Sequence, residues 1–288
     1  MTAPALALVL VAAVLHATWN FFAKRLGGGV GAVWLYSALS TACLAPIAAA
    51  VVWVTRPSVS APAAIFMLGS AILHLGYFVS LQSGYREGDL SVVYPLARGT
   101  GPLLAAIAAI SVFGERPTPL AMTGAALIAG GIFALAGGRA IFGTGGHASP
   151  AGVGYGLLTG IFIAAYTLWD KQAVAVIGTA PIVQTLGENF GRSVLLVPAA
   201  WLRRAEVARH WRQHRALLLW IAVLVPLGYT LVLTAMVFTP VSYVAPAREI
   251  SILIGTAMGA RWLAEGRAPL RLAGASAMVV GLVALALG

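Results

Sequence analysis

The chain repeats itself after 150 residues, and this internal repeat limits its possible folds more than any other feature of the sequence. The two copies align without a gap, which predicts a first repeat at residues 1–138, a glycine-rich connector at 139–150 and a second repeat at 151–288. One structural unit has therefore been used twice. The residues that coincide include Trp19 with Trp169, Arg98 with Arg248, Glu115 with Glu265, Gly124 with Gly274, and Gly131 with Gly281.

Each copy contains about five strongly apolar stretches, in a chain with 60% hydrophobic and only 9% charged residues. A water-soluble protein of this composition would expose more apolar surface than such proteins tolerate, so a lipid bilayer is the expected solvent. Each stretch reaches the roughly 20 residues that a helix needs to cross about 30 Å of hydrocarbon. The ten stretches are residues 3–22, 31–54, 62–84, 89–112, 119–137, 151–174, 180–202, 215–238, 241–264 and 268–287.

These stretches predict an all-α integral membrane protein with ten transmembrane helices. Because each repeat crosses the membrane an odd number of times, the second repeat enters from the side opposite to the first. Two inverted five-helix repeats around a central cavity form the arrangement of many secondary transporters. The fourth stretch should be broken or kinked, because the segment from Pro95 to Pro102 contains these two prolines and two glycines. The ninth stretch, which contains Pro246 and fewer glycines, should be distorted less.

The net charge of +10 is carried largely by loops, and this placement argues against a nucleic-acid partner. Twelve lysines and arginines follow odd-numbered stretches, and only Arg56, Arg116 and Lys171 lie in loops on the other side. By the positive-inside rule the odd-numbered loops are cytoplasmic and both termini face out. The densest run, Arg203–Arg215, includes Trp211 and is typical of a juxtamembrane anchor beside anionic lipid.

Charged side chains at membrane depth are costly and usually face a cavity or a partner, so each is a candidate for function. Arg98, Arg192 and Arg248 lie inside predicted spans. Guanidinium groups bind carboxylate, phosphate or phosphonate through two hydrogen bonds, so these three predict a substrate with an anionic group. The expected substrate contacts are Arg98, Arg248, Arg192, Tyr94, His16, Asn20, Trp19, His74, Trp169 and Tyr243.

Three acids, Glu188, Asp170 and Glu249, share this depth and are candidates for coupling transport to protons. Coupling requires a carboxyl group whose protonation changes between the inward and outward states, and burial can bring such a change near neutral pH. Glu188 is the first choice and Asp170 the second. A nearby acid would also receive a substrate amine.

Structural roles compete with several of these interpretations. Glu188 and Arg192 are four residues apart, so they would equally form an ion pair that only fixes packing. Arg98 or Arg248 would alternatively reach the membrane interface by snorkelling. His74 would serve as a hydrogen-bonded residue of the helix bundle.

Two further patterns have both a functional and a structural interpretation. His16, Asn20 and Lys24 lie on one helix face, which suits a hydrogen-bonded stripe as well as a cavity lining. His210 and His214 have the spacing of a metal pair, but arginines surround them and no third ligand follows. We therefore expect neither a metal nor another cofactor.

The end of each copy carries a shared motif. The first copy reads Ser91-Val92-Val93-Tyr94-Pro95-Leu96-Ala97-Arg98 and continues through Gly114-Glu115-Arg116 to Gly124, and the second reads Val241-Ser242-Tyr243-Val244-Ala245-Pro246-Ala247-Arg248-Glu249 and continues through Glu265 to Gly274. Both resemble the EamA-type repeat of the drug/metabolite transporter superfamily, and His16-Ala17-Thr18-Trp19-Asn20 is similar to the start of many bacterial members. The resemblance implies ten helices in two inverted repeats, a central cavity, alternating access and a place in the bacterial inner (cytoplasmic) membrane.

We therefore expect a secondary active transporter for a small polar metabolite, anionic or zwitterionic and amino-acid-like or phosphonate-like. The resemblance favours export, driven by protons or a counter-substrate, by a monomer or weak homodimer. Two alternatives are an intramembrane lipid-modifying enzyme and a broad-specificity drug exporter of the same fold. The enzyme is disfavoured because the sequence contains neither an acid pair at metal-ligand spacing nor a Gly-x-Ser-x-Gly motif.

Overall fold

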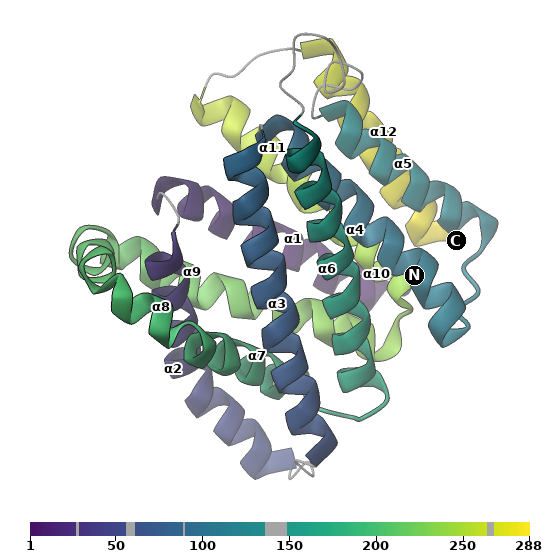
Figure 1. The fold of residues 1–288 in the computed structure, drawn as a ribbon. Coiled ribbons are helices and arrows are strands. Elements are labelled where there is room, and N and C mark those ends of the chain that lie inside the picture. Colours follow the sequence, from purple (N-terminus) through teal and green to yellow (C-terminus); the bar gives the residue numbers. More distant parts are fainter. Residues whose placement is uncertain (27–28, 56–60, 89, 136–148, 264–267) are drawn as a thin grey trace. The chain divides into compact units, whose positions relative to one another are not determined.

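The computed structural model describes residues 1–26, 29–55, 61–88, 90–135, 149–263 and 268–288, and Figure 1 shows it as a ribbon. Throughout these residues the regular elements are α-helices, and no strand is present. The all-α class predicted from the apolar stretches is confirmed for this part of the chain. The helices are α1 (Ala3–Leu26), α2 (Val30–Thr55), α3 (Ala61–Glu87), α4 (Leu90–Phe113), α5 (Pro119–Leu135), α6 (Pro150–Ala175), α7 (Pro181–Leu195), α8 (Val197–Leu202), α9 (Arg204–Phe238), α10 (Val241–Arg248), α11 (Ile250–Leu263) and α12 (Ala268–Leu287).

Six helical segments among the described residues are long and apolar enough to cross a membrane. They are Ala3–Ala23, Val30–Thr55, Ala61–Glu87, Val92–Phe113, Pro150–Ala175 and Arg204–Phe238. Two shorter apolar helices, Pro119–Leu135 and Ala273–Leu287, coincide with the predicted fifth and tenth spans. These helices support a multi-pass membrane protein, whereas the count of ten spans and the inverted repeat stay predictions.

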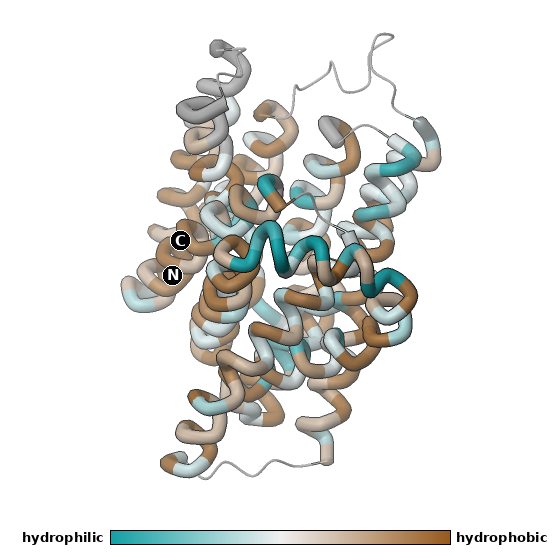
Figure 2. The backbone as a smooth tube through the Cα atoms, turned by 90° about the vertical axis from the view of Figure 1, so that its left-hand side faces the viewer, coloured by the Kyte–Doolittle hydropathy of each residue, from teal (hydrophilic) through white to brown (hydrophobic). Residues whose placement is uncertain are grey.

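The distribution of apolar side chains also indicates that lipid surrounds the protein. On α2, Trp53 and Val54 are 80% and 78% exposed, and such side chains recur along most of the long helices. Figure 2 shows the long helices mostly in the hydrophobic colour, whereas the hydrophilic colour gathers in a continuous stretch at the start of α9. Apolar surface of this extent is unfavourable in water and favourable in a bilayer.

Helix α7 has its polar side chains inside and its apolar side chains outside. Phe190 and Val194 are more than half exposed. This reversed polarity suits a lipid environment and brings a polar stripe into the protein interior. The buried residues of α7 are Val183, Gln184, Thr185, Glu188, Asn189, Arg192 and Ser193.

The chain divides into two compact units. The first unit comprises Met1–Leu10, Leu73–Leu168 and Phe238–Gly288, and the second unit comprises Val11–Ile72 and Trp169–Val237. Each unit therefore contains segments of both sequence repeats.

In the first unit, α5 and α12 pack closely along two pairs of glycines. Gly124 lies against the backbone of Gly281, and Gly131 lies against the backbone of Gly274. A methyl group added to Gly124 would lie 2.5 Å from the carbonyl oxygen of Gly281, so no larger residue fits without a shift. Gly274 and Gly281 are the repeat counterparts of Gly124 and Gly131. Gly124 therefore contacts the counterpart of Gly131, and Gly131 contacts the counterpart of Gly124, which is the pattern of contacts across a two-fold axis.

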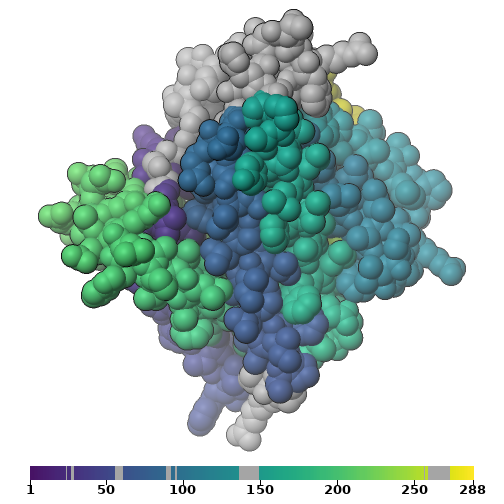
Figure 3. Space-filling view, in the orientation of Figure 1, coloured from purple at the N-terminus to yellow at the C-terminus, as the bar shows by residue number. Residues whose placement is uncertain are grey.

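Helices α3 and α6 also lie side by side in the first unit, and Figure 3 shows their adjoining surfaces. The ring of Phe162 packs against Gly76, and the backbone of Gly152 lies against that of Gly88. Small residues thus let the two helices approach closely, which is how membrane helices gain packing energy.

The second unit is held by an apolar cluster in which α1, α2 and α9 meet. Its buried members are Leu26, Ala32, Leu35, Leu218 and Ile221. The turn between α1 and α2 uses Gly29 with a φ of 100°, a conformation that glycine adopts readily. Beside it the carboxylate of Glu206 accepts a hydrogen bond from the amide of Gly31 (3.2 Å), which ties the first turns of α9 to the start of α2.

The predictions about helix breaks differ from the observed helices. Helix α4 runs from Leu90 to Phe113 as one element, so a break between Tyr94 and Pro102 is excluded, while a kink there stays a prediction. Membrane helices tolerate prolines where neighbouring helices and side chains satisfy the carbonyl groups that proline leaves free. The ninth stretch, expected to be the milder case, breaks at Glu249, where α10 ends and α11 begins.

The predicted seventh and eighth spans also differ from the observed helices. The seventh, expected at 180–202, is divided at Leu196 into α7 and α8. Helix α9 begins at Arg204, and His214 interrupts it with non-helical angles of φ −133° and ψ 23°. The described residues do not include positions 139–148 of the connector predicted at 139–150. They do not include Glu265 either.

Candidate functional site

The central polar contact of the first unit is an ion pair between Arg98 of α4 and Glu249 at the break between α10 and α11. The Nη2 atom of Arg98 lies 2.8 Å from Oε2 of Glu249, and the two side chains are 5% and 1% exposed. This burial contradicts the alternative in which Arg98 snorkels to the membrane interface. Removing either partner would leave a buried charge without this compensation.

Arg248 contacts the same carboxylate. Its Nε atom lies 3.5 Å from Oε1 of Glu249, and its side chain is as deeply buried as that of Arg98. Arg248 therefore does not snorkel either. Arg98 and Arg248, which are repeat counterparts, thus contact the same acid. This acid, Glu249, is the single residue between α10 and α11.

Three tyrosines surround this ion pair. Tyr77, Tyr94 and Tyr166 lie close enough to Arg98 to interact with it electrostatically. Tyr166 also stacks on His74, with ring centroids 4.1 Å apart, and meets Tyr77 edge-on at 6.0 Å. The group therefore combines a guanidinium, a carboxylate, hydroxyl groups and aromatic faces.

A small cavity lies beside Arg98, between α4, α5 and α10 of the first unit. Arg98, Pro246 and Glu249 line it, and its volume is ≈ 10 Å³. A cavity of this size is about the smallest that holds one water molecule. A carboxylate or phosphate therefore does not fit in this cavity while Glu249 holds Arg98.

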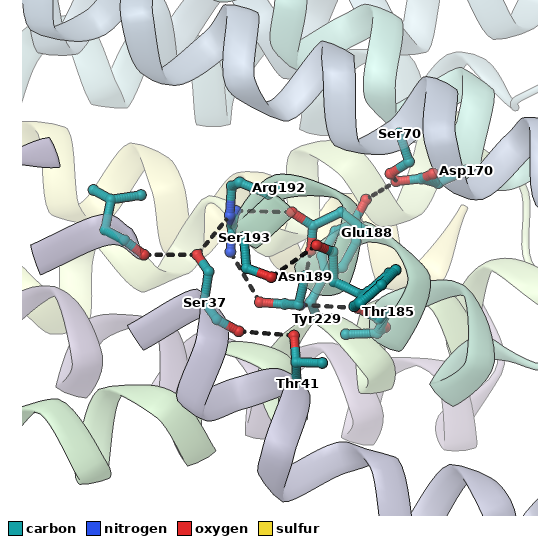
Figure 4. Close-up of polar contacts among 12 residues, drawn as sticks. Ser37, Thr41, Ser70, Asp170, Thr185, Glu188, Asn189, Arg192, Ser193 and Tyr229 are labelled. Atoms are coloured by element: carbon teal, nitrogen blue, oxygen red, sulfur yellow. Dashed lines mark hydrogen bonds and ion pairs between the residues drawn. The ribbon is translucent and has the colours of Figure 1, made fainter. Parts of the chain in front are cut away.

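In the second unit, Asp170 of α6 is a fully buried acceptor, shown in Figure 4. Ser70 donates to its Oδ2 at 3.0 Å, and Gln184 donates to its Oδ1 at 2.9 Å. The hydroxyl of Tyr229 also donates to Oδ2. These donors come from α3, α7 and α9, so the carboxylate ties three helices to α6.

Further along α7, Glu188 and Arg192 form the ion pair that their spacing predicted, with Nη1 of Arg192 2.8 Å from Oε1 of Glu188. Asn189 closes a ring: it donates to Oε2 of Glu188 at 2.8 Å and accepts from Nη2 of Arg192 at 2.9 Å. Nε of Arg192 donates to the hydroxyl of Ser37 at 2.9 Å, which joins α7 to α2 (Figure 4). The Arg192 guanidinium also lies 5.7 Å from the centre of the Tyr36 ring.

Four other predicted substrate contacts in the second unit form structural hydrogen bonds, within α1 or between α6 and α3. The indole nitrogen of Trp19 donates to Nδ1 of His16 at 3.3 Å, and Asn20 donates to the carbonyl oxygen of His16 at 2.7 Å. Trp169 donates to the carbonyl oxygen of Phe66 at 2.8 Å, which joins α6 to α3. These contacts fit the structural interpretation of the α1 stripe, while the side chain of Lys24 lies outside the described residues.

Tyr243, predicted to contact substrate, lies in the first unit at the start of α10. Its hydroxyl accepts from the amide of Thr118 and donates to the carbonyl oxygen of Gly288, both at 3.3 Å. Tyr243 also lines a pocket of ≈ 320 Å³ together with Met1 and Phe238. Its hydrogen bonds anchor α10 beside the C-terminal end of α12.

Glu115 fixes the same helix start. Its two carboxylate oxygens accept hydrogen bonds from the amides of Val241 and Ser242 at 2.7 and 2.8 Å. A carboxylate at a helix N-terminus satisfies free amides and interacts favourably with the helix dipole. Glu115 therefore holds the helix that ends in Arg248 and leads to Glu249.

The predicted residues are divided between the two units, and within each unit only some of them contact one another. The first unit contains Arg98, Arg248, Glu249, Tyr94, His74 and Tyr243, and the second unit contains Arg192, Glu188, Asp170, His16, Trp19, Asn20 and Trp169. The ring centroids of His210 and His214 are 6.2 Å apart, and in the described part of the chain no three metal-binding side chains gather.

The sequence interpretation missed several polar side chains that complete these contacts, among them Tyr77, Tyr166, Ser37, Ser70, Gln184, Asn189 and Tyr229. Tyr166 is the repeat counterpart of His16, and that coincidence was a usable signal. Tyr77 and Tyr229 fall opposite aliphatic residues in the other repeat, so the repeat does not mark them.

Comparison with known proteins agrees with the shared motifs. Residues 3–137 match the EamA-like transporter family, which confirms the resemblance for the first copy of the repeat. No curated protein sequence matches the chain significantly. A solved structure titled only "Crystal structure of protein" matches with a TM-score of 0.77 and 17% identity, over 100% of this chain and 98% of that one. At this identity the likeness shows a shared fold alone.

Proposed function

Because residues 3–137 of this chain belong to the EamA-like transporter family, we propose that the protein is a secondary active transporter for a small polar metabolite with an anionic group. The substrate is amino-acid-like or phosphonate-like, and the protein exports it across the inner (cytoplasmic) membrane. The observation that carries this proposal is Arg98, which is buried beside Glu249 and a group of tyrosines.

An arginine inside a membrane segment is costly, so its presence calls for a functional or structural partner. The planar guanidinium matches the geometry of a carboxylate or phosphate through two parallel hydrogen bonds. In the structure the carboxylate of Glu249 pairs with this guanidinium. The hydroxyl groups of the neighbouring tyrosines suit a polar substrate, and Glu249 is available to an amino group once Arg98 is released.

Substrate binding exchanges one partner of Arg98 for another. The anionic group of the substrate replaces Glu249, because the cavity beside Arg98 holds about one water molecule at most. Glu249 is the residue between α10 and α11, so its release alters the contact of both helices with α4. Two states with different partners for Arg98 give the differential binding on which alternating access depends.

The acids of the second unit are the candidates for coupling. Glu188 lies in the ring with Arg192 and Asn189, and Asp170 accepts three hydrogen bonds. Protonation of Asp170 would weaken its bond to Gln184, which joins α7 to α6. Protonation of Glu188 would weaken the ring within α7 that holds Arg192, whose Nε joins α7 to Ser37 of α2. A proton-driven transport cycle uses this change in protonation. If neither acid changes its protonation, the protein exchanges its substrate for a counter-substrate.

The proposal includes ten membrane crossings in two inverted repeats, residues 1–138 and 151–288, which act as a monomer or weak homodimer. The reciprocal glycine contacts of α5 and α12 support a two-fold relation between the repeats, because they join α5 to its own repeat counterpart.

A ligand screen by thermal unfolding of the detergent-purified protein tests the substrate class. A ligand that binds the folded state raises the melting temperature by mass action. We expect stabilisation by an amino acid, a phosphonate or another small anion in the wild type and in Arg86→Gln, an exposed control, but not in Arg98→Gln. Stabilisation by cationic drugs alone would instead assign the protein as a broad-specificity drug exporter, and chemical conversion of an added lipid would assign it as an enzyme.

A further inference from the structure

The start of α9 carries a dense basic surface that the proposed transport cycle does not use. Residues 201–215 contain five arginines and a single acid, Glu206. Arg203, Arg204, Arg209, Arg212 and Arg215 are all exposed, and they belong to the second unit. We call these five arginines, with Trp201 and Trp211, the basic segment.

The inner face of this stretch is fixed to the protein. Glu206 accepts a hydrogen bond from the amide of Gly31 and lies 3.8 Å from His210, which is buried. Val207 packs against the apolar cluster of α1, α2 and α9. Glu206 also lies 3.9 Å from Nη1 of Arg203 and offsets that charge in part. Arg204, Arg209, Arg212 and Arg215 remain as exposed positive charges.

The geometry of α9 places the basic segment outside the hydrocarbon. Helix α9 has 35 residues, which correspond to about 50 Å at helical rise, well above the ~30 Å of a bilayer core. The non-helical residue His214 divides the polar first turns from the apolar remainder, and Arg203 divides them from α8. The polar turns therefore form a short helix bounded by a bend at each end.

Exposed apolar side chains flank the arginines. Trp201 and Leu202 are 68% and 85% exposed, and Trp211 is 42% exposed. The guanidinium of Arg204 lies 6.0 Å from the centre of the Trp201 ring. Tryptophan is enriched where membrane helices meet the headgroup layer, and arginine beside it binds phosphate. This combination fits a lipid surface better than a nucleic acid in solution.

We propose that the basic segment binds the phosphate groups of anionic phospholipids, and that this binding stabilises the fold through the attachment of Glu206 and Val207 to the start of α2. The site recognises negative headgroup charge, while Trp201 and Trp211 lie at the level of the acyl-chain boundary. This site is separate from Arg98 and does not depend on the identity of the substrate.

Thermal unfolding of the delipidated protein in a neutral detergent tests the proposal, with dioctanoyl phosphatidylglycerol as the probe. We expect the anionic lipid to raise the melting temperature in a saturable way, and dioctanoyl phosphatidylcholine to have little effect. The double variant Arg209→Gln/Arg212→Gln should require about 25-fold more phosphatidylglycerol, since each juxtamembrane arginine contributes about fivefold. The variant Arg209→Lys/Arg212→Lys, which keeps the charge, should stay within a few-fold of the wild type.

The matched control is Arg86→Gln/Arg116→Gln, which removes two exposed arginines outside the basic segment and should respond like the wild type. Equal stabilisation by phosphatidylcholine, or an unchanged response in Arg209→Gln/Arg212→Gln, would overturn the proposal. Inorganic phosphate that stabilises as strongly at the same concentration would reassign the site to free anions. A short single-stranded RNA with the stronger effect would reassign it to nucleic acid.

Discussion

Replacing Gly124 by alanine should destabilise the protein, because this glycine lies where α5 and α12 approach most closely. The added methyl carbon would lie 2.5 Å from the carbonyl oxygen of Gly281 and 2.7 Å from the amide nitrogen of Leu285. Carbon atoms in packed interiors rest at roughly 3.5–4.0 Å from their neighbours, so the helices must separate by about 1 Å. Both obstacles are backbone atoms, which cannot rotate away.

The expected cost is about 1–3 kcal/mol, the usual range for overpacking in a close contact. A gap of about 1 Å also removes up to half of the dispersion energy along the contact. The matched control is Gly130→Ala on the same helix, where an added methyl group meets no atom within 4 Å. That substitution should be neutral or stabilise by about 0.5–1 kcal/mol, since alanine favours a helix more than glycine does.

The free energy of unfolding, measured by titrating the purified protein from mild detergent into dodecyl sulfate, compares these variants. Gly274→Ala, the repeat counterpart, should cost about as much as Gly124→Ala, because its methyl group would lie 2.8 Å from the carbonyl oxygen of Gly131. Equal stabilities of Gly124→Ala and Gly130→Ala would refute the close approach of α5 and α12.

Three further predictions concern the polar groups of the second unit. Tyr229→Phe removes one donor to Asp170 and should lower the free energy of unfolding by about 1–3 kcal/mol in the same titration; an unchanged value would show that this hydrogen bond contributes nothing. Arg192→Met should cost about 3–5 kcal/mol because it leaves Glu188 buried without its cation, and Glu188→Met on that background should recover most of the loss; additive costs in this double-mutant cycle would contradict a direct pair. Proton-driven transport in proteoliposomes should be lost in Glu188→Gln or in Asp170→Asn, and its survival in both variants at normal expression would remove these acids from coupling.

Helix class and position follow from the sequence more reliably than helix breaks do. An apolar stretch of about 20 residues marks its own boundaries, and the stretch predicted at 31–54 is α2 at Val30–Thr55. A proline breaks a membrane helix only if no other group replaces the lost hydrogen bond. Helix α4 continues past Pro95 and Pro102, whereas α10 ends at Arg248, directly before Glu249, whose carboxylate pairs with Arg98 on another helix. Neither circumstance is visible in a window of apolar residues.

In the candidate site, contacts within one helix could be predicted from the sequence, whereas contacts between helices could not. The pair of Glu188 and Arg192 follows from their spacing of four residues on one helix. The pair of Arg98 and Glu249 joins the two repeats, and nothing in the spacing indicates which acid Arg98 would meet. Tyr94 was predicted, whereas Tyr77 and Tyr166 were missed for the same reason, because only the folded chain brings α3 and α6 to Arg98 of α4.

Counterflow in proteoliposomes distinguishes an Arg98 that binds the anionic group of a transported metabolite, as we propose, from one that has only a structural role. Vesicles loaded with an unlabelled ligand from the thermal screen should transiently accumulate the labelled ligand above equilibrium, with saturable kinetics. Arg98→Lys should reduce counterflow markedly although the charge is kept, because lysine lacks the two parallel donors, and Arg86→Lys should match the wild type. Undiminished counterflow by folded, monodisperse Arg98→Lys and Arg98→Gln would contradict the claim and leave Arg98 as a structural partner of Glu249.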